Sequence, residues 1–502
     1  MTPSQDRTGL AASGLKFGPE EGVFIGGRWV PSDQPLRVHF PYDGREIAVL
    51  SCATEHHVDL ALAAARKAFA EYRRWPAHRR ADFLKAIARR LADRLADLAT
   101  AVTLETGKPI TEARIEAQRS VRIFEYAAGE AQRLCGEMIP LDALPGGENR
   151  LAFTLREPVG IVAAITPFNF PLALASHKVA PALAAGNAVV LKPAAQTPLS
   201  AVLLGRAVAE AGGPEGVFNL LAGPGSPIGQ RLVSDSRVGM VTFTGSVDVG
   251  RAIRREAGLK RVTLELGANC AAIVEPDADL QLAATRCTWA AFAHSGQVCI
   301  SLQRLFVHRD VFEELTRALV QKARDLVVGH PFDEATQISC LITRREAERV
   351  EEWIHRAVRG GARVLAGGQR RDSTVVPTIL TDVRPDMEVC CREVFGPVVT
   401  VTPYDCLDEA IGLVNDSRYG LQAGVFTQDI SRALAAASQI ETGGVMINEA
   451  PMFRMDHMPY GGVKESGLGR EGPHYAIEEM TERKIVTINL AGRAGGGRAQ
   501  CP

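Results

Sequence analysis

From Pro158 onward the chain alternates short apolar runs with helix-like segments, and this alternation limits the possible fold more than any other feature. Helix-compatible segments separate five apolar runs, which lie at residues 159–165, 187–192, 217–221, 239–243 and 261–266. Strands that each return through a helix form parallel sheets with helices on both faces. The pattern therefore predicts a doubly wound, Rossmann-like α/β domain.

A second alternating set begins after Gly267. Its strand candidates lie at residues 304–308, 364–365, 378–380, 398–404 and 444–448. A chain of 502 residues is too long for one ordinary core, and its 46% apolar residues supply enough aliphatic material for two or three packed units. We therefore expect two doubly wound domains in one chain.

The remaining segments complete this division of the chain. A short strand near residues 23–30 and a helical region from residue 57 to about residue 104 precede the alternation. The predicted units are a first domain from residues 17–135 and 156–265, a second domain from residues 266–455, and oligomerisation strands at residues 136–155 and 482–492. Residues 1–16 and 493–502 are expected to be disordered tails, because they are polar and rich in small residues.

Charge and cysteine usage exclude several classes of partner. The chain has 57 basic and 58 acidic residues, so no overall field favours binding to nucleic acid or to an anionic membrane. No run of 18 apolar residues and no signal-like segment occurs, which favours a cytoplasmic protein. The ten cysteines lack the spacing of a metal site, and a disulfide framework is not expected.

Three polar residues stand at the ends of apolar runs: Asn169, Glu265 and Cys299. Taken singly, each has an ordinary explanation, namely a turn former, an ion-paired glutamate and a buried thiol behind the apolar residues 289–292. The carboxyl ends of parallel strands, however, are where doubly wound sheets expose functional side chains. Together, a thiol, an amide and a carboxylate suffice for covalent acyl chemistry.

These three sites and four further motifs resemble the aldehyde dehydrogenase superfamily over nearly the whole chain. The motifs are Leu191-Lys192-Pro193, Phe243-Thr244-Gly245-Ser246, Glu393-Val394-Phe395-Gly396-Pro397 and the run from Pro459 to Gly467. The forms Phe168-Asn169 and Val298-Cys299-Ile300-Ser301 look more like the lactaldehyde and non-phosphorylating glyceraldehyde-3-phosphate branches. The resemblance implies a dinucleotide-binding first domain, a catalytic second domain carrying Cys299, and a homodimer or homotetramer.

The resemblance also implies a mechanism and a product. The Cys299 thiolate would add to an aldehyde, and the Asn169 amide with the Cys299 N–H would hold the oxyanion. Glu265 would then activate water to hydrolyse the thioester to a free carboxylic acid. An alcohol or hydroxy-acid dehydrogenase would leave all three residues unexplained, and a non-catalytic scaffold would be expected to lack one of them.

Cofactor residues are predicted partly from small residues that let backbone approach phosphates and partly from the resemblance. They are Thr166, Pro167, Lys192, Ala195, Gly225, Phe243, Gly245, Ser246, Leu266, Glu393 and Phe395. Ala195 stands where the family usually has a glutamate that binds the adenine ribose. Its absence removes repulsion toward a 2′-phosphate, so we expect NADP to be accepted alongside or ahead of NAD, unless Ala195 merely weakens NAD binding.

The substrate residues predicted are Arg119, Phe170, His177 and Arg454. Arg119 shares a helical face with Ile115, Ile123 and Tyr126, where it meets either a structural partner or a substrate anion. These residues favour a small oxygenated or anionic aldehyde over a large apolar one. Val298 stands where the glyceraldehyde-3-phosphate branch has a cation, which argues against a phosphorylated triose.

Overall fold

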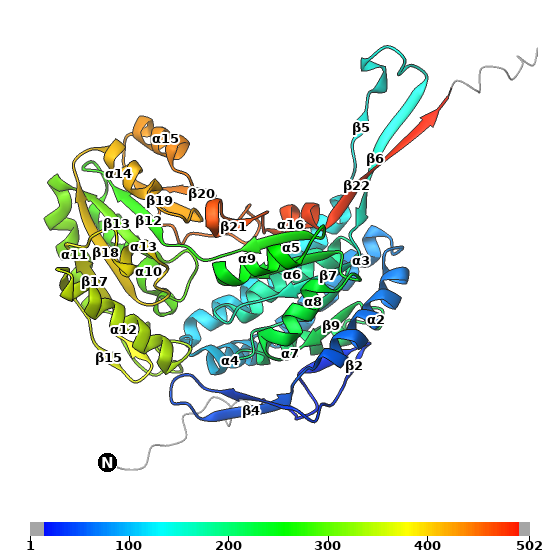
Figure 1. Ribbon diagram of the computed structural model, residues 1–502, viewed down its shortest axis with the longest axis horizontal. Helices are drawn as coiled ribbons and strands as arrows, with labels where there is room; N and C mark the ends of the chain where they lie inside the picture. The colour runs from blue at the N-terminus through cyan, green and yellow to red at the C-terminus, as the bar shows by residue number, and fades with distance from the viewer. Residues whose placement is uncertain (1–14, 491–502) are drawn as a thin grey trace, which may run out of the picture.

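The computed structural model describes residues 15–490 (Figure 1). The expected C-terminal tail, residues 493–502, therefore lies outside the described residues, and of the expected N-terminal tail only residues 15 and 16 are described. Leu15 is 7% exposed and packs into the hydrophobic core, so the packed chain already includes a residue that we had assigned to the N-terminal tail.

The first sheet has eight strands in the order β2-β1-β9-β8-β7-β10-β11-β21. Its five central strands are parallel and almost fully buried, as expected for a sheet covered on both faces. They are β7 (Ile161–Ile165), β8 (Ala188–Lys192), β9 (Phe218–Leu221), β10 (Met240–Thr244) and β11 (Arg261–Glu265). These strands match the predicted apolar runs and confirm the α/β fold.

Helices cover both faces of this sheet. Pro76 and Pro109 each stand directly before the first residue of a helix and so separate it from the helix that precedes it. The predicted helical region is three helices: α2 (Glu55–Tyr72), α3 (Ala77–Ala92) and α4 (Leu95–Thr106). A fourth helix, α5 (Ile110–Arg133), follows beyond the predicted end of this region. The helices between the strands are α6 (Pro171–Ala184), α7 (Leu199–Glu210), α8 (Gln230–Ser234) and α9 (Val247–Glu256).

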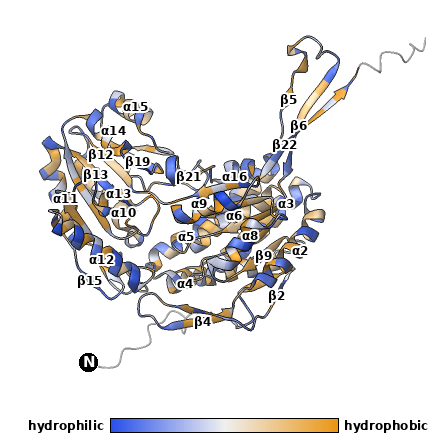
Figure 2. Cartoon of the chain, in the orientation of Figure 1, coloured by the Kyte–Doolittle hydropathy of each residue, from blue (hydrophilic) through white to orange (hydrophobic). Residues whose placement is uncertain are grey.

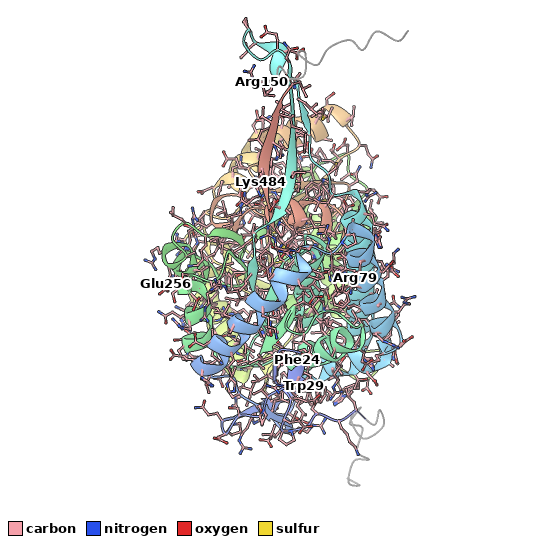
Figure 3. The ribbon with its side chains drawn as sticks, turned by 90° about the vertical axis from the view of Figure 1, so that its right-hand side faces the viewer. Phe24, Trp29, Arg79, Arg150, Glu256 and Lys484 are labelled. Carbon is pink, nitrogen blue, oxygen red and sulfur yellow. The ribbon has the colours of Figure 1, made fainter. Side chains whose placement is uncertain are left out.

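The strand expected at residues 23–30 is instead a hairpin of β1 (Val23–Ile25) and β2 (Arg28–Trp29). Gly26 and Gly27 have φ values of 60° and 84°, a left-handed turn that reverses the chain. The hairpin brings the rings of Phe24 and Trp29 to 4.9 Å, and both lie at the lower end of the molecule in Figure 3.

The second sheet has seven strands in the order β14-β17-β18-β13-β12-β19-β20. All its pairings are parallel except that of β14 with β17. The strands are β12 (Cys270–Val274), β13 (Leu302–His308), β14 (Arg363–Ala366), β17 (Thr378–Thr381), β18 (Val398–Tyr404), β19 (Gln422–Phe426) and β20 (Gly444–Ile447). The helices are α10 (Leu280–Phe292), α11 (Phe312–Arg324), α12 (Arg344–Arg359), α13 (Glu388–Cys391), α14 (Leu407–Asn415) and α15 (Ile430–Gln439).

A three-stranded ribbon projects away from both sheets (Figures 1 and 3). It consists of β5 (Met138–Ile139), β6 (Arg150–Pro158) and β22 (Thr481–Asn489). Arg150 and Lys484 mark it in Figure 3. Several apolar side chains of the ribbon are exposed, among them Leu151, Leu155, Ile485 and Ile488. In Figure 2 the orange of hydrophobic residues extends along this ribbon, away from the core.

Two further segments were not predicted as elements from the sequence. A hairpin of β3 (Pro35–His39) and β4 (Glu46–Ser51) follows β2 at the edge of the first domain. After residue 455 the chain returns to the first sheet, where β21 (Gly467–Leu468) pairs with β11, and it then forms α16 (Pro473–Glu479). This returning segment was assigned to no domain from the sequence, and it contributes to the site described next.

Candidate active site

Cys299 lies in the loop between α10 and β13, directly after the short helical turn η3 (Ala293–Gly296). The thiol is half-buried, and its Sγ lies 2.9 Å from the Tyr460 hydroxyl oxygen. Burial, and then the Glu265 carboxylate, raise the pKa of this thiol to about 12. The thiol therefore holds its proton at neutral pH and must lose it before it can attack as a thiolate.

The backbone before Cys299 is unusual. His294, Ser295 and Gly296 have φ values of 47°, 54° and 72°, a run in the left-handed region. A Cβ at Gly296 would lie 2.1 Å from the Gly396 carbonyl oxygen, so only glycine permits this approach of the two loops. The expectation of a buried Trp289 upstream was wrong: its side chain is 44% exposed, whereas the next three residues are buried.

Asn169 lies between β7 and α6 and is buried. Its side-chain Nδ2 donates a hydrogen bond to the Gln297 carbonyl oxygen at 2.8 Å. Gln297 is itself fixed, because its Oε1 accepts from the Ile342 N–H at 2.8 Å. The structure thus brings the Asn169 amide against the segment that carries Cys299.

Glu265 is the last residue of β11, where it pairs with Gly467 of β21. It is buried, and its Oε1 has no hydrogen-bond partner among the described residues. Burial, and then the negative charge of Glu471, raise the pKa of Glu265 to about 8. A buried carboxyl with an unsatisfied oxygen and a pKa near working pH is the environment of a general acid or base.

The predicted cofactor residues surround the carboxyl edge of the first sheet. Ser246 is the residue before α9, and a Cβ at Gly225 would meet nothing within 4 Å. The hydroxyl of Thr166 is buried without a partner among the described residues. An accessible glycine, a helix N-terminus and an unsatisfied hydroxyl fit a phosphate-bearing dinucleotide.

Two other predicted cofactor residues, Glu393 and Phe395, lie on the loop before β18. The Glu393 carboxylate accepts a hydrogen bond from the Ala268 N–H at 3.0 Å, and burial raises its pKa to about 7. Phe395 meets Phe168 edge-to-face with ring centroids 5.7 Å apart. Pro167 is half-buried beside Phe168.

Three more predicted cofactor residues lie near Glu265. Leu266 follows it directly in the chain, and Phe243 pairs with Leu264 across β10 and β11. The Gly245 N–H donates to the Glu265 carbonyl oxygen at 3.0 Å. These contacts place the predicted cofactor residues next to the predicted base.

Lys192 ends β8 and is buried, and its ammonium donates to the Pro193 carbonyl oxygen at 2.9 Å. Burial lowers its pKa to about 8. Ala195, half-buried, lines a cavity of about 1310 Å³ together with the β3–β4 hairpin and residues 369–376. This cavity does not include Cys299, Glu265 or Asn169, so the chemistry is located by those side chains and not by the cavity.

Three of the four predicted substrate residues, Arg119, His177 and Arg454, contact carboxylates. Arg119 forms two-atom contacts with Asp456, the shorter at 2.8 Å, and His177 Nε2 lies 3.1 Å from the same carboxylate. Asp456 thus gives Arg119 the structural partner that was one of its two expected roles. Ile115 and Tyr126, expected on the same helical face, are exposed, and only Ile123 is buried.

Arg454 lies closer to the nucleophile. Its guanidinium stacks 3.6 Å from the centre of the Tyr460 ring, and it donates to Glu471 at 3.1 Å. Lys178 donates to the other Glu471 oxygen at 2.8 Å. Burial opposes ionisation, but Lys178 and then Arg454 lower the pKa of Glu471, so this carboxylate is charged.

Sequence reasoning missed three residues of the site: Tyr460, Glu471 and Asp456. Tyr460 belongs to a motif that was recognised, but no role followed from it. Tyr460 and Glu471 exchange both backbone hydrogen bonds, at 3.1 and 2.6 Å, across an isolated bridge. The intervening eleven-residue spacing has no regular period, so the sequence gives no signal that the two side chains meet.

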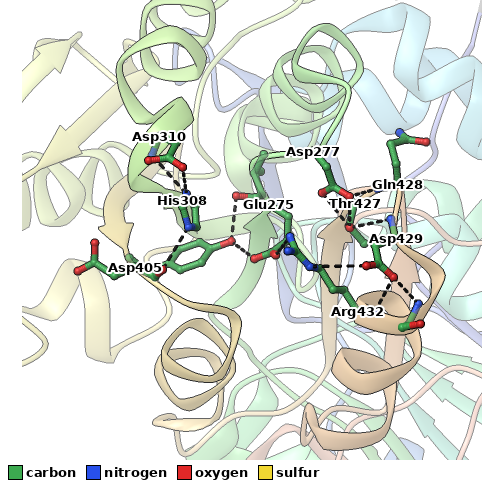
Figure 4. Close-up of polar contacts among 12 residues, drawn as sticks. Glu275, Asp277, His308, Asp310, Asp405, Thr427, Gln428, Asp429 and Arg432 are labelled. Carbon is green, nitrogen blue, oxygen red and sulfur yellow. Dashed lines mark hydrogen bonds and ion pairs between the residues drawn. The ribbon is translucent and has the colours of Figure 1, made fainter.

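The carboxyl edge of the second sheet also collects polar side chains (Figure 4). Glu275 accepts from Tyr404 at 2.5 Å and from Arg432 at 2.8 Å, and Asp277 accepts from Thr427 at 2.9 Å. These groups satisfy one another. The cluster is explained as internal pairing, in contrast to the unsatisfied Glu265.

Comparison with known proteins agrees with this chemistry. Residues 29–486 match the model of the aldehyde dehydrogenase family. A 3-sulfolactaldehyde dehydrogenase of Priestia aryabhattai is 48% identical over 473 residues, covering 93% of this chain and 98% of the relative. A lactaldehyde dehydrogenase of Methanococcus aeolicus is 39% identical over 471 residues, covering 93% and 100%. The crystal structure of an NADP-dependent glyceraldehyde-3-phosphate dehydrogenase from Bacillus halodurans with NADP superposes with a TM-score of 0.92 at 37% identity, covering 95% and 100%.

The fold and these matches define an NAD(P)-dependent oxidoreductase that acts on aldehydes. The chain belongs to the aldehyde dehydrogenase family. The resemblance predicted from the sequence, including its lactaldehyde and glyceraldehyde-3-phosphate branch, is confirmed. In residues 15–490, no helix combines the length and apolar character needed to cross a membrane.

Proposed function

We propose that this enzyme oxidises a small, singly charged anionic hydroxyaldehyde, such as 3-sulfolactaldehyde, to its carboxylic acid. The observation that carries the proposal is the position of Arg454, which stacks on Tyr460 while the Tyr460 hydroxyl lies 2.9 Å from the Cys299 sulfur. A fixed cation two contacts from the nucleophile favours a substrate anion close to its aldehyde carbon. The relative named for 3-sulfolactaldehyde oxidation supports an anionic substrate, and the relative named for lactaldehyde oxidation supports a small hydroxyaldehyde.

In the proposed mechanism Cys299 releases its proton to solvent, and the thiolate adds to the aldehyde carbon. The Asn169 Nδ2 and the Cys299 N–H stabilise the negative charge that develops on the aldehyde oxygen. A bound NAD(P) supplies the hydride acceptor. Loss of hydride from the tetrahedral carbon restores the carbonyl and leaves a thioester on Cys299.

Glu265 completes the cycle in its ionised form. It accepts a proton from water as the water oxygen attacks the thioester carbon. The Cys299 thiolate then leaves and the carboxylic acid is released. The unsatisfied Oε1 of Glu265 supports this role, because an acceptor is left free for that proton.

The charge balance near Arg454 supports a monoanion. Lys178 and Arg454 are two cations that share the single carboxylate of Glu471. One positive charge in this group is therefore unmatched while Glu265 is protonated, which is its state below its pKa of about 8. Arg119 is balanced by Asp456, and burial lowers the pKa of His177, which is therefore neutral. A substrate sulfonate or carboxylate would supply the missing negative charge, whereas a phosphate dianion would exceed it.

Replacing Arg454 by methionine tests the substrate class. We expect kcat/KM for 3-sulfolactaldehyde to fall about 10- to 100-fold, the value of a lost charge-assisted hydrogen bond, and kcat/KM for uncharged lactaldehyde to fall much less. Arg119→Met is expected to act in the same direction, more weakly. Arg122→Met, an exposed arginine on the same helix as Arg119, is the control. Unchanged kcat/KM for the anionic aldehyde in both Arg454→Met and Arg119→Met would refute the proposal.

We also propose that Ala195 lets the adenine-ribose subsite accept a 2′-phosphate. Restoring a carboxylate with Ala195→Glu is expected to raise the KM for NADP at least about tenfold through charge repulsion, while the KM for NAD is unchanged or lower. Gln196→Glu, which adds the same charge at the neighbouring exposed position, is the control. An equal change for both cofactors in Ala195→Glu would contradict this assignment.

The projecting ribbon supports the proposal of a homodimer or homotetramer. Its strands expose apolar side chains on a ribbon that has no core of its own, and such a surface is typical of a subunit contact.

A cytoplasmic location is also proposed. The nine cysteines in the described part of the chain are free thiols, as is usual in a reducing compartment.

A further inference from the structure

Helix α5 presents two glutamates to the two segments that form the proposed oxyanion hole. Glu112 and Glu116 are one helical turn apart and therefore lie on the same face. The Oε1 of Glu112 accepts a hydrogen bond from the His294 N–H at 3.2 Å, in the loop that leads to Cys299. The Oε1 of Glu116 accepts from the N–H groups of Leu172 and Ala173 at 3.1 and 3.2 Å, in the first turn after Asn169.

Glu116 is held in turn by Lys108. The Lys108 ammonium contacts the second carboxylate oxygen of Glu116, and both side chains are completely buried. The same ammonium lies 3.6 Å from the centre of the Phe170 ring, next to Asn169 in the chain. A buried ion pair contributes little net stability compared with apolar packing, so its position calls for another explanation.

The two anchored segments also meet each other. The Phe170 ring contacts the His294 ring edge-to-face, with centroids 5.7 Å apart. Asn169 donates to the Gln297 carbonyl oxygen, two residues before Cys299. Phe170 therefore lies between Lys108 on the α5 side and His294 on the side of the nucleophile loop.

We propose that Glu112 and Glu116 are positioning residues that set the distance between the Asn169 amide and Cys299. The inference rests on the proposed role of Asn169 as an oxyanion donor. Such a donor acts only when it lies about 2.7–3.1 Å from the developing charge, and a misplacement of about 1 Å can cost about 100-fold in rate. A carboxylate that fixes the first turn after Asn169 controls that distance without touching the substrate.

A double-mutant cycle between Glu116→Ala and Asn169→Ala tests this. The measurement is the rate of cofactor reduction in the first turnover with 3-sulfolactaldehyde. We expect Asn169→Ala to lower this rate about 100-fold and Glu116→Ala about tenfold. In the Asn169→Ala background, Glu116→Ala should change the rate less than about twofold, because it acts through the amide that is already missing.

A second measurement separates positioning from general damage. Alkylation of Cys299 by iodoacetamide needs the thiol but develops no oxyanion, so its rate should be unchanged in Glu116→Ala. In Glu112→Ala, which loses an anchor of the nucleophile loop, both the alkylation rate and the first-turnover rate should change. Glu125→Ala, an exposed glutamate on the same helix, should leave both rates unaltered.

Several outcomes would overturn the inference. If the effects of Glu116→Ala and Asn169→Ala multiply, Glu116 acts independently of the amide and is only structural. If Asn169→Ala leaves the first turnover unchanged, the oxyanion role fails and the inference fails with it, which identifies the proposed function as the source. Should Glu116→Ala not fold, Glu116→Gln and Lys108→Met replace it in the cycle, with smaller reductions that must likewise disappear when Asn169 is absent.

Discussion

Cys299→Ala is expected to abolish aldehyde oxidation, with kcat lower by about 10⁴-fold or more, because no other group among the site residues can form the thioester. Binding of NAD(P) should be retained, since the predicted phosphate and ribose contacts involve other residues. Steady-state cofactor reduction measures the first effect, and quenching of protein fluorescence by the cofactor measures the second. Cys391→Ala removes an exposed thiol of the same domain and should leave activity intact.

The state of the thiol adds a pH dependence to this prediction. The raised pKa of Cys299, about 12, means that its thiolate fraction increases with pH throughout the neutral range. The first-turnover rate of the wild-type enzyme should therefore rise with pH across the neutral range. Full activity of Cys299→Ala at any pH would remove the covalent mechanism altogether.

Glu265→Gln is expected to separate the two halves of the reaction. The introduced amide cannot accept a proton from water, so the thioester should form and then persist. The expected result is a burst of about one reduced cofactor per active site, followed by turnover slower by about 10²- to 10⁴-fold. Rapid-mixing absorbance measures the burst, and mass spectrometry of the quenched protein detects the acyl group on Cys299.

The pH dependence of the second half follows from the pKa of Glu265. Burial and Glu471 favour the protonated form and raise this pKa to about 8, so the base is mostly ionised only above that pH. The hydrolysis rate should increase as pH rises through about 8 and then level off. The Glu265→Gln variant has no titrating carboxyl at this position, so its slow hydrolysis should not show this increase in rate with pH. A steady rate in Glu265→Gln without a burst would show that Glu265 acts before the thioester forms.

The positions of site residues could be predicted from the sequence where a single strand fixes the side chain's place in the fold. Glu265 ends a buried parallel strand and Asn169 follows another, so their position at the carboxyl edge of one sheet could be predicted. The apolar runs also predicted the central strands to within a few residues. The hairpin at Gly26 and Gly27 was missed, although a Gly-Gly pair between two apolar segments is itself a turn signal in the sequence.

Contacts between distant segments could not be predicted. The Cys299 sulfur meets Tyr460 across 161 residues, and Arg119 meets Asp456 across 337. Neither pair lies on a shared element whose period would align them. Arg119 was expected to meet either a structural partner or a substrate anion, and the structure shows a carboxylate that occupies it. Arg454 was grouped with Arg119 by charge alone, but its stacking on Tyr460 depends on the bridge to Glu471.

The projecting ribbon has a consequence for how assembly can be followed in solution. Strand β6 pairs with β22 over nine residues, yet most of these residues are exposed or only half-buried. Backbone amides in so thinly packed a segment open at low free energy, and a covering subunit would slow their exchange with solvent deuterium. The exchange rate of residues 150–158 would therefore report subunit association directly, at a position remote from the thiol and without any need for substrate.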